Sequence, residues 1–259
     1  MNPAICYLGD DHLGGAAAYL TGVLAHYGMP VDRVDGADAP PHDFLRRAYA
    51  LYVVSDYPAE RFRPGEMEHI AAAVRDGAGL LMLGGWESFH GRLGEYHRTP
   101  LADVLPVTMQ ASDDRRNCAQ PCLIHKTAEH PILEGLPWDA PPAIGGYNAL
   151  GVRPGADLLL ELAPFAVARC GDDYRFAPGP RAPLLVVGTF GAGRTAALAT
   201  DVAPHWVGGW VDWGDRRITQ SVATGFIEVG NHYARFFRNL VAWTGRLAEF
   251  ARAPNVPRS

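Results

Sequence analysis

The sequence predicts an α/β protein built on a mostly parallel, doubly wound sheet. In the first part of the chain, short apolar segments alternate with amphipathic segments of helical spacing, which is the pattern of consecutive βα units. The chain has 259 residues, 48% of them hydrophobic and 20% charged, and is long enough to bury a full core. No repeat or linker-like segment divides it, so we expect one domain at residues 1–250 and a loose tail at residues 251–259.

Four buried strands and two helices are expected in this first part. The strands are expected at residues 4–9, 31–35, 50–57 and 79–85. Apolar side chains recur every three or four positions in residues 14–28 and 64–75, which predicts a helix at each place. Strands separated by helices in this way lie parallel in one sheet.

The second half of the chain follows a different pattern. Beyond about residue 96, proline and glycine become frequent, and residues 143–162 and 165–170 predict short antiparallel strands. Residues 182–200 hold two apolar runs joined by the sequence FGAG, which predicts a hairpin. Residues 231–246 form an amphipathic pattern, so we expect a closing helix that packs on the sheet.

Composition and charge exclude several classes of partner. The formal net charge is -5 and the arginines are scattered, so nucleic acid is not an expected partner. No apolar run reaches the roughly 20 residues that cross a bilayer, and the N-terminus lacks the pattern of a signal peptide. We therefore expect a cytoplasmic protein without a membrane partner. Four cysteines are too few for a disulfide framework, and Cys6 is expected to be a buried, reduced thiol.

Acidic residues and a histidine follow several of the predicted strands. They are Asp10 and Asp11, Asp56, Glu87, and Asp201 with His205. Ligands of open parallel sheets bind at the carboxyl ends of the strands. Each acid alone is more readily explained as a helix cap or a turn residue. Taken together, these residues predict a pocket for a small molecule.

Familiar cofactor motifs are missing from the sequence. Gly14 and Gly15 follow the first strand, but the spacing of a dinucleotide-binding loop is absent, and so is a P-loop. Cys118, Cys122 and two later histidines, His125 and His130, have irregular spacing, so buried thiols are a better explanation than a zinc site. We expect no cofactor, and no metal ligand is assigned.

The segment GAGLLMLGGWESFHG, residues 77–91, has the form of a nucleophile elbow. A buried strand runs into a glycine pair, as where α/β enzymes present a reactive side chain on a sharp turn. The position of the nucleophile holds Trp86, and Ser88 is displaced from it. The elbow therefore carries no nucleophile.

Taken in order, several segments resemble the class I glutamine amidotransferase-like superfamily, in particular its cytoplasmic subgroup related to ThuA-like proteins. The resemblance rests on the elbow segment, on YHRTPLADVLPV and DDR (residues 113–115), on EHPILEGLPW, on LATDVAPHW and on YARFFRNLVAWTG. It implies a flavodoxin-like three-layer sandwich, with an antiparallel extension in the second half and the active site at the carboxyl edge of the sheet.

The same resemblance implies where the catalytic groups of working glutaminases would fall. An elbow cysteine attacks the amide in those enzymes, backbone N–H groups hold the oxyanion, and a histidine paired with glutamate activates the thiol. Trp86 falls on the position of the cysteine and His205 near that of the histidine, but no His-x-Glu follows. Because an indole cannot form a thioester, glutaminase activity is expected to be absent.

The first functional hypothesis is a pocket that binds or transforms a small polar metabolite, with a sugar-like ligand suggested by the ThuA-like relatives. His205 would be the general acid or base, oriented by Asp201, with Glu87 as a further catalytic group. The remaining expected lining residues are Asp10, Asp56, Gly85, Trp86, Ser88, Asp113 and Trp206.

Two alternatives remain open at this point. The stretch HWVGGWVDWGDRR places Trp206, Trp210 and Trp213 in a glycine-rich loop, which would suit an assembly interface or a lid over the pocket. Asp10, Asp56, Glu87 and His205 together offer oxygen and nitrogen ligands for a metal-dependent hydrolase. In either case we expect a homo-oligomer.

Overall fold

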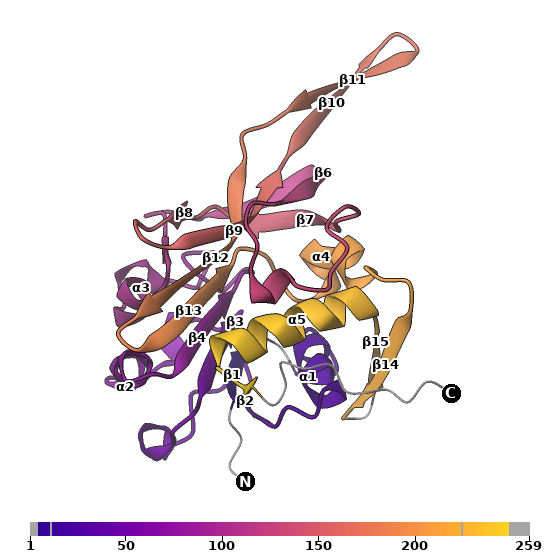
Figure 1. Cartoon of the computed structure of the whole chain (residues 1–259). Helices are drawn as coiled ribbons and strands as arrows, with labels where there is room; N and C mark the ends of the chain where they lie inside the picture. Colours follow the sequence, from indigo (N-terminus) through magenta and orange to yellow (C-terminus); the bar gives the residue numbers. More distant parts are fainter. Residues whose placement is uncertain (1–4, 11, 224, 249–259) are drawn as a thin grey trace.

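The computed structural model describes residues 5–10, 12–223 and 225–248, and the predicted tail at 251–259 and Asp11 lie outside them. Its centre is a nine-stranded sheet of order β2-β1-β3-β4-β13-β12-β9-β6-β7, with helices on both faces (Figure 1). The predicted three-layer, flavodoxin-like α/β fold is confirmed. The prediction of one domain is not tested by this arrangement and stays a prediction.

One half of the sheet is parallel, as predicted. It contains β2 (Val31–Val34), β1 (Ile5–Gly9), β3 (Leu51–Ser55), β4 (Gly79–Leu83) and β13 (Gly193–Leu198). Every residue of β1, β3 and β4 is buried, because helices cover both faces of a parallel sheet. These helices are α1 (Ala17–His26), α2 (Glu66–Arg75) and α5 (Asn231–Thr244).

The other half of the sheet is antiparallel, which confirms the predicted extension. It contains β12 (Ala182–Phe190), β9 (Asp157–Ala163), β6 (Arg115–Lys126) and β7 (Ala143–Asn148). β12 and β13 form the predicted hairpin, whose turn holds Gly191 at φ 60°, a backbone angle that glycine adopts without strain.

Three strand pairs and several short helices complete the described chain. β10 (Phe165–Cys170) and β11 (Asp173–Pro178) form an arm that projects from the body (Figure 1). The other pairs are β5 (Val107–Thr108) with β8 (Gly151–Val152), and β14 (Arg217–Val222) with β15 (Gly225–Gly230). The short helices are α3 (Pro100–Val104), α4 (Pro204–Val211), and 3-10 turns at Phe44–Arg46, Ala59–Arg61, Tyr96–Arg98 and Pro131–Leu133.

The tryptophan-rich segment differs from its prediction as a glycine-rich loop. Residues Pro204–Val211 form helix α4, and Trp206, Trp210 and Trp213 are only 2%, 0% and 8% exposed. Trp210 packs against Phe236 on α5, with the two ring centroids 4.7 Å apart. The prediction that these indoles form an interface is wrong, because the core covers them.

The four cysteines match the sequence-based expectation of buried thiols only in part. Cys6 and Cys122 are buried as predicted, whereas Cys118 is half-buried and Cys170 is exposed on the arm. Burial, with Cys118 beside it, raises the pKa of Cys122 to about 12.

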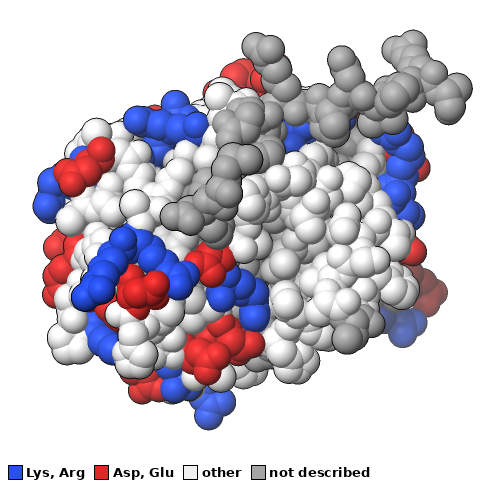
Figure 2. All heavy atoms as spheres, turned by 90° about the horizontal axis from the view of Figure 1, so that it is seen from below, with Lys and Arg blue, Asp and Glu red and all other residues white. Residues whose placement is uncertain are grey.

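Figure 2 shows Lys and Arg interspersed with Asp and Glu beside a broad uncharged area on one face of the molecule. Among the described residues, no helix is both long and apolar enough to span a membrane.

Candidate functional site

Three aspartates meet at the carboxyl ends of the parallel strands. Asp10 follows β1, Asp56 follows β3, and Asp201 lies three residues beyond β13. Each places a carboxylate oxygen within 4.8 Å of the other two. We call these three residues the aspartate cluster. The parallel sheet creates it, because adjacent parallel strands end at the same edge.

The backbone at these strand ends is held in unusual conformations. Asp10 has φ 51° and Asp56 has φ 40°, both in the left-handed region, which aspartate tolerates better than most residues. Gly85, after β4, has φ 155°, and a Cβ there would lie 2.0 Å from Oδ1 of Asp56. Glycine is therefore required at residue 85 so that the Asp56 carboxylate can occupy that space.

Asp10 is the most deeply enclosed member of the cluster. It is 2% exposed, and it accepts a hydrogen bond from the Tyr7 hydroxyl through Oδ2. Its Oδ1 is buried without a hydrogen-bond partner of good geometry in the described part of the chain. Burial, and then the nearby charge of Asp201, raise the pKa of Asp10 to about 7.

The pKa values of the other two carboxyls, Asp56 and Asp201, are raised for the same reasons. Burial and the charge of Asp10 raise the pKa of Asp56 to about 8. Burial and the charge of Asp56 raise the pKa of Asp201 to about 7, although its Oδ1 accepts the N–H groups of Val202 at 2.5 Å and Ala203 at 3.0 Å. Like charges this close cannot all ionise together near neutral pH. The cluster therefore holds protons that it can donate or accept.

Trp86 and His205 do come together, as the resemblance implies. Their ring centroids are 5.8 Å apart at an interplanar angle of 65°. Trp86 is 38% exposed, and the Arg115 guanidinium lies 4.5 Å from its ring centroid. Asp113 holds Arg115 with two hydrogen bonds of 2.9 Å and 2.6 Å. The exposed indole thus has the His205 ring beside it and a cation held against its ring.

The backbone of the elbow is directed at Asp56. The N–H of Glu87, the residue after Trp86, donates to Oδ1 of Asp56 at 2.8 Å. Ser88 is fully buried, and its hydroxyl accepts the N–H of Asp56 at 2.9 Å. Ser88 therefore holds the backbone of Asp56 in position.

The other predicted residues are placed as follows. His205 is exposed at the start of α4 and has no hydrogen bond to Asp201 within the described ranges. Glu87 is half-buried, and its charge contributes to the raised pKa of Asp56. Trp206 is 2% exposed and donates its indole N–H to Asn117 at 2.8 Å. The structure thus brings the aspartates together but encloses Trp206 in the core.

Two functional neighbours were not identified from the sequence. Asn148 is fully buried, accepts the N–H of Gly85 at 2.9 Å and donates to Asp114 at 2.8 Å. Asp114, also fully buried, accepts the N–H groups of His90 and Gly91. Asp114 lies within the DDR segment, which could have indicated it. No local pattern indicates Asn148, whose role depends on the pairing of β6 with β7.

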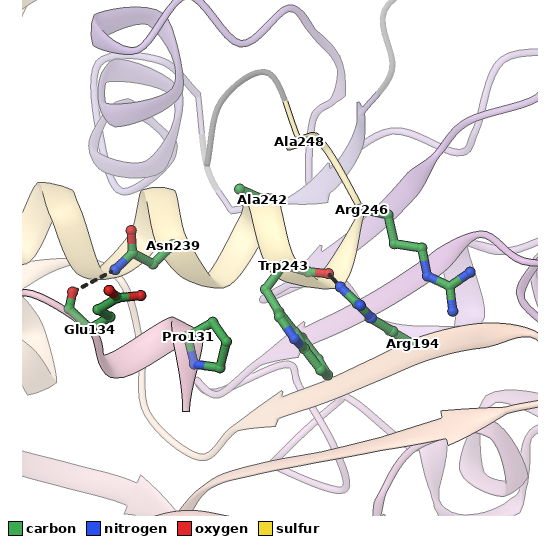
Figure 3. Close-up of a pocket in the computed structure, with 8 residues that line it drawn as sticks. All are labelled: Pro131, Glu134, Arg194, Asn239, Ala242, Trp243, Arg246 and Ala248. Carbon is green, nitrogen blue, oxygen red and sulfur yellow. Dashed lines mark hydrogen bonds between the residues drawn. The ribbon is translucent and has the colours of Figure 1, made fainter. Parts of the chain in front are cut away.

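A separate cavity of about 390 Å³ lies elsewhere in the molecule (Figure 3). Arg194, at the amino end of β13, lies 4.7 Å from the Trp243 ring centroid and donates to the Trp243 carbonyl at 2.8 Å. The other lining residues are Pro131, Glu134, Asn239, Ala242, Arg246 and Ala248. Because β13 begins at Gly193 and the aspartates follow its carboxyl end, this cavity and the aspartate cluster lie toward opposite ends of the strand.

Two solved structures are similar to the chain over most of its length. A cytoplasmic protein of Salmonella typhimurium LT2, STM1381, has 27% identity and a TM-score of 0.72, covering 93% of this chain and 98% of its own. A second cytoplasmic protein of Salmonella typhimurium, STM3548, has 25% identity and a TM-score of 0.71 with the same coverage. A β-galactosidase from Rahnella sp. R3 shares the fold over 33% of its own chain, with 16% identity and a TM-score of 0.56.

The family comparison covers the elbow and the late strand. No curated protein sequence matches the chain. The family model described as "Putative glutamine amidotransferase" matches residues 50–221, which is about two thirds of the 259 residues. With the elbow, the sheet and the Salmonella structures in agreement, the chain belongs to the glutamine amidotransferase-like family.

Proposed function

We propose that this protein binds a small polyhydroxylated metabolite at the aspartate cluster and acts on it by acid–base chemistry, without glutaminase activity. The observation that carries the proposal is the convergence of Asp10, Asp56 and Asp201 within 4.8 Å, with raised pKa values near neutrality. Perturbed carboxyls of this kind are typical of functional sites. A role in the cytoplasm is inferred from the two Salmonella proteins.

The protonation of the cluster suits a ligand rich in hydroxyl groups. A protonated carboxyl donates one hydrogen bond, and an ionised carboxylate accepts several. A cluster that holds some protons at pH 7 can therefore both donate to and accept from neighbouring hydroxyls. Groups whose pKa values lie near the working pH are also efficient general acids and bases. Asp56 is the best placed to exchange a proton, because it is less enclosed than Asp10.

Trp86 supplies the apolar side of such a site. An exposed indole face can cover the C–H face of a sugar-like ring while the hydroxyls on its edge reach the carboxyls. Arg115 stiffens this wall through its contact with the indole ring. His205 lies beside the same ring and is the proposed second proton-transfer group, with Glu87 near Asp56.

Two features argue against glutamine hydrolysis by the route of the family. The elbow holds an indole in place of a thiol. In addition, the N–H after an elbow nucleophile normally contributes to the oxyanion hole, but here the Glu87 N–H already donates to Asp56. We expect Trp86→Cys to leave ammonia release from glutamine at the background rate, because the oxyanion donor stays engaged. Robust turnover by that variant would contradict this account.

The test of ligand class is saturation-transfer NMR with a panel of neutral monosaccharides and polyols. We expect at least one compound to bind, with affinity reduced about tenfold or more in Asp56→Asn and in Trp86→Ala, since each removes one group worth about 1–2 kcal/mol. Asp139→Asn, at an exposed aspartate, is the matched control. Absence of binding across the panel, or binding that neither variant weakens, would sink the proposal.

A metal-dependent hydrolase is a second candidate, favoured by the three carboxylates that lie within 4.8 Å of one another. Three carboxylates are suitable oxygen ligands for Mg²⁺ or Mn²⁺. A bound cation would stabilise the ionised carboxylates and lower their pKa values. Calorimetric titration with Mg²⁺ and Mn²⁺ separates the two functions: saturable binding that Asp56→Asn removes supports the hydrolase, and its absence supports the metal-free acid–base site.

Self-association through the β10–β11 arm is a third proposal. The register places Phe165, Val167 and Arg169 on the same face as Tyr174 and Phe176, and the two aromatic residues of β11 are 64% and 66% exposed. An isolated two-stranded hairpin is only marginally stable in water. A second copy of the chain would cover this apolar face.

Charge at the tip of the arm supports a second copy as the partner. Arg169 and Arg175 are exposed beside Asp172 and Asp173, so the tip carries both signs of charge and would not repel the same tip of a second copy. Light scattering after size exclusion is expected to show a dimer that Phe176→Ser dissociates. Phe226→Ser, at an equally exposed phenylalanine on β15, is the control. A monomeric wild-type protein would contradict this proposal.

A further inference from the structure

A second cluster of titratable side chains lies in the loop after β4, and the proposed function does not use it. His90, Glu95 and His97 each place one ligand atom within 4.8 Å of the others. Nε2 of His90 lies 3.8 Å from Oε1 of Glu95, and Nδ1 of His97 lies 3.8 Å from Oε2. These distances are too long for direct hydrogen bonds. We call these residues the histidine cluster.

Both histidines have buried nitrogens that the protein leaves without a partner. Nδ1 of His90 and Nδ1 of His97 are buried and make no hydrogen bond among the residues that the structure describes. Their rings face each other, with centroids 4.3 Å apart and an interplanar angle of 33°. Buried polar atoms are nearly always paired. The His97 nitrogen that faces Glu95 at 3.8 Å makes no hydrogen bond and therefore keeps its lone pair or proton for a further group.

Hydrogen bonds to the backbone fix the loop that carries His90 and Glu95. The N–H of Glu95 donates to the carbonyl of His90 at 3.0 Å, which closes the loop between two of the three residues. The carboxylate of Asp114, fully buried, accepts the N–H groups of His90 at 3.1 Å and Gly91 at 3.0 Å. The backbone that carries these two ligands is thus ordered before any ion binds, which lowers the cost of binding.

We propose that His90, Glu95 and His97 bind one divalent transition-metal ion, with Zn²⁺ as the expected occupant. Two imidazoles and one carboxylate form a ligand set that zinc accepts. A tetrahedral ion with bonds of about 2.0–2.2 Å holds its ligand atoms about 3.4 Å apart. Each histidine nitrogen lies 3.8 Å from one of the two Glu95 oxygens, and the three ligand atoms lie within 4.8 Å of one another, so the side chains must close in by up to about 1.4 Å around the ion. Glu95 is 55% exposed, which leaves a fourth position for water.

The test uses the full-length protein after removal of metal by chelation. Zn²⁺ is titrated against a chromophoric chelator, and one equivalent per chain is expected to bind. Glu95→Gln and His97→Ala are each expected to weaken binding about 100-fold or more, because each removes a ligand. His42→Ala, at an exposed histidine outside the cluster, is the matched control and should bind zinc as the wild type does.

Further measurements distinguish zinc binding at the histidine cluster from zinc binding elsewhere in the protein. Cys118 and Cys122 have sulfurs 3.1 Å apart and could compete for zinc, so Co²⁺ is added as a probe. A spectrum without a thiolate-to-cobalt band supports the histidine cluster, and zinc binding lost in Cys118→Ser would overturn it. Zinc binding lost in Asp56→Asn but retained in Glu95→Gln would also overturn it. Failure of sugar binding at the aspartate cluster has no bearing on these outcomes.

Discussion

The aspartate cluster and the histidine cluster differ in how the fold creates them. The aspartates come from three strand ends that are far apart in the sequence, and the sheet forces three like charges together in a buried place. The histidine cluster comes from eight consecutive positions of one loop and combines two kinds of ligand atom. The first arrangement retains protons because charge repulsion and burial act together, whereas the second is suited to an added cation.

This difference determines how each cluster should respond to mutation. The aspartate cluster is part of the packed sheet edge, so changes there should alter the stability of the whole protein. The histidine cluster includes a side chain that is 55% exposed, so changes there should alter metal binding and leave the metal-free fold almost unchanged.

The largest loss of stability is expected from Gly85→Ala. The new Cβ would lie 2.0 Å from Oδ1 of Asp56, at a φ of 155° that side chains rarely adopt. We expect a loss of about 3–5 kcal/mol in the free energy of unfolding, measured by urea denaturation. Gly208→Ala within α4, where a Cβ meets nothing within 4 Å, is the control and should change it by less than about 1 kcal/mol. Equal effects of the two variants would show that the aspartate cluster is loosely held.

Asp56→Asn is expected to change the free energy of unfolding in the opposite direction, so that the variant is more stable than the wild type at high pH. The pKa of Asp56 is about 8 in the folded protein and about 4 when unfolded. The native state therefore binds more protons between about pH 4 and pH 8, and the stability of the wild type should fall as the pH rises through this window. Four pKa units correspond to about 5 kcal/mol. The amide retains an acceptor for the Glu87 N–H, so the variant should be more stable than the wild type by up to about 5 kcal/mol at pH 8.

The measurement is a series of urea denaturations from pH 5 to pH 9. The curve of Asp56→Asn should be flatter than that of the wild type, and the two should approach each other toward pH 5, because the wild-type penalty disappears only near pH 4, the pKa of the unfolded carboxyl. Parallel curves for the two proteins would mean that the Asp56 carboxyl is ionised throughout this range, and the proton-sharing account would be wrong.

The smallest effect on the metal-free protein is expected from Glu95→Gln. Its side chain is 55% exposed, so unfolding without metal should change by less than about 0.5 kcal/mol. With free Zn²⁺ at 100 times the dissociation constant, the wild type should gain about 2.7 kcal/mol, and the variant should gain almost nothing. Thermal melts with and without Zn²⁺ measure this difference. If Zn²⁺ stabilised the wild type and Glu95→Gln equally, Glu95 would not be a zinc ligand, and the proposed difference between the two clusters would be wrong.

Prediction from the sequence succeeded where one structural rule applied to many residues. The rule that ligand sites lie beyond the carboxyl ends of parallel strands located Asp10, Asp56 and Asp201 although they are distant in the sequence. The histidine cluster is local in the sequence but was not identified, because its spacing matches no known ligand pattern. Trp206, Trp210 and Trp213 were assigned to a loop because glycines separate them, and the core instead packs them on α4 and beside it.

The sequence by itself determined the alternation of strands and helices, the elbow without a nucleophile and the acids that follow the strands. These features depend on apolar periodicity and on residue identity, which are written directly in the chain. Only the tertiary structure decided that three carboxyls share one buried place, that the Glu87 N–H faces Asp56, and that Asn148 and Asp114 support the elbow. Distances and burial depend on the packing of distant segments, and the protonation of the aspartates follows from both.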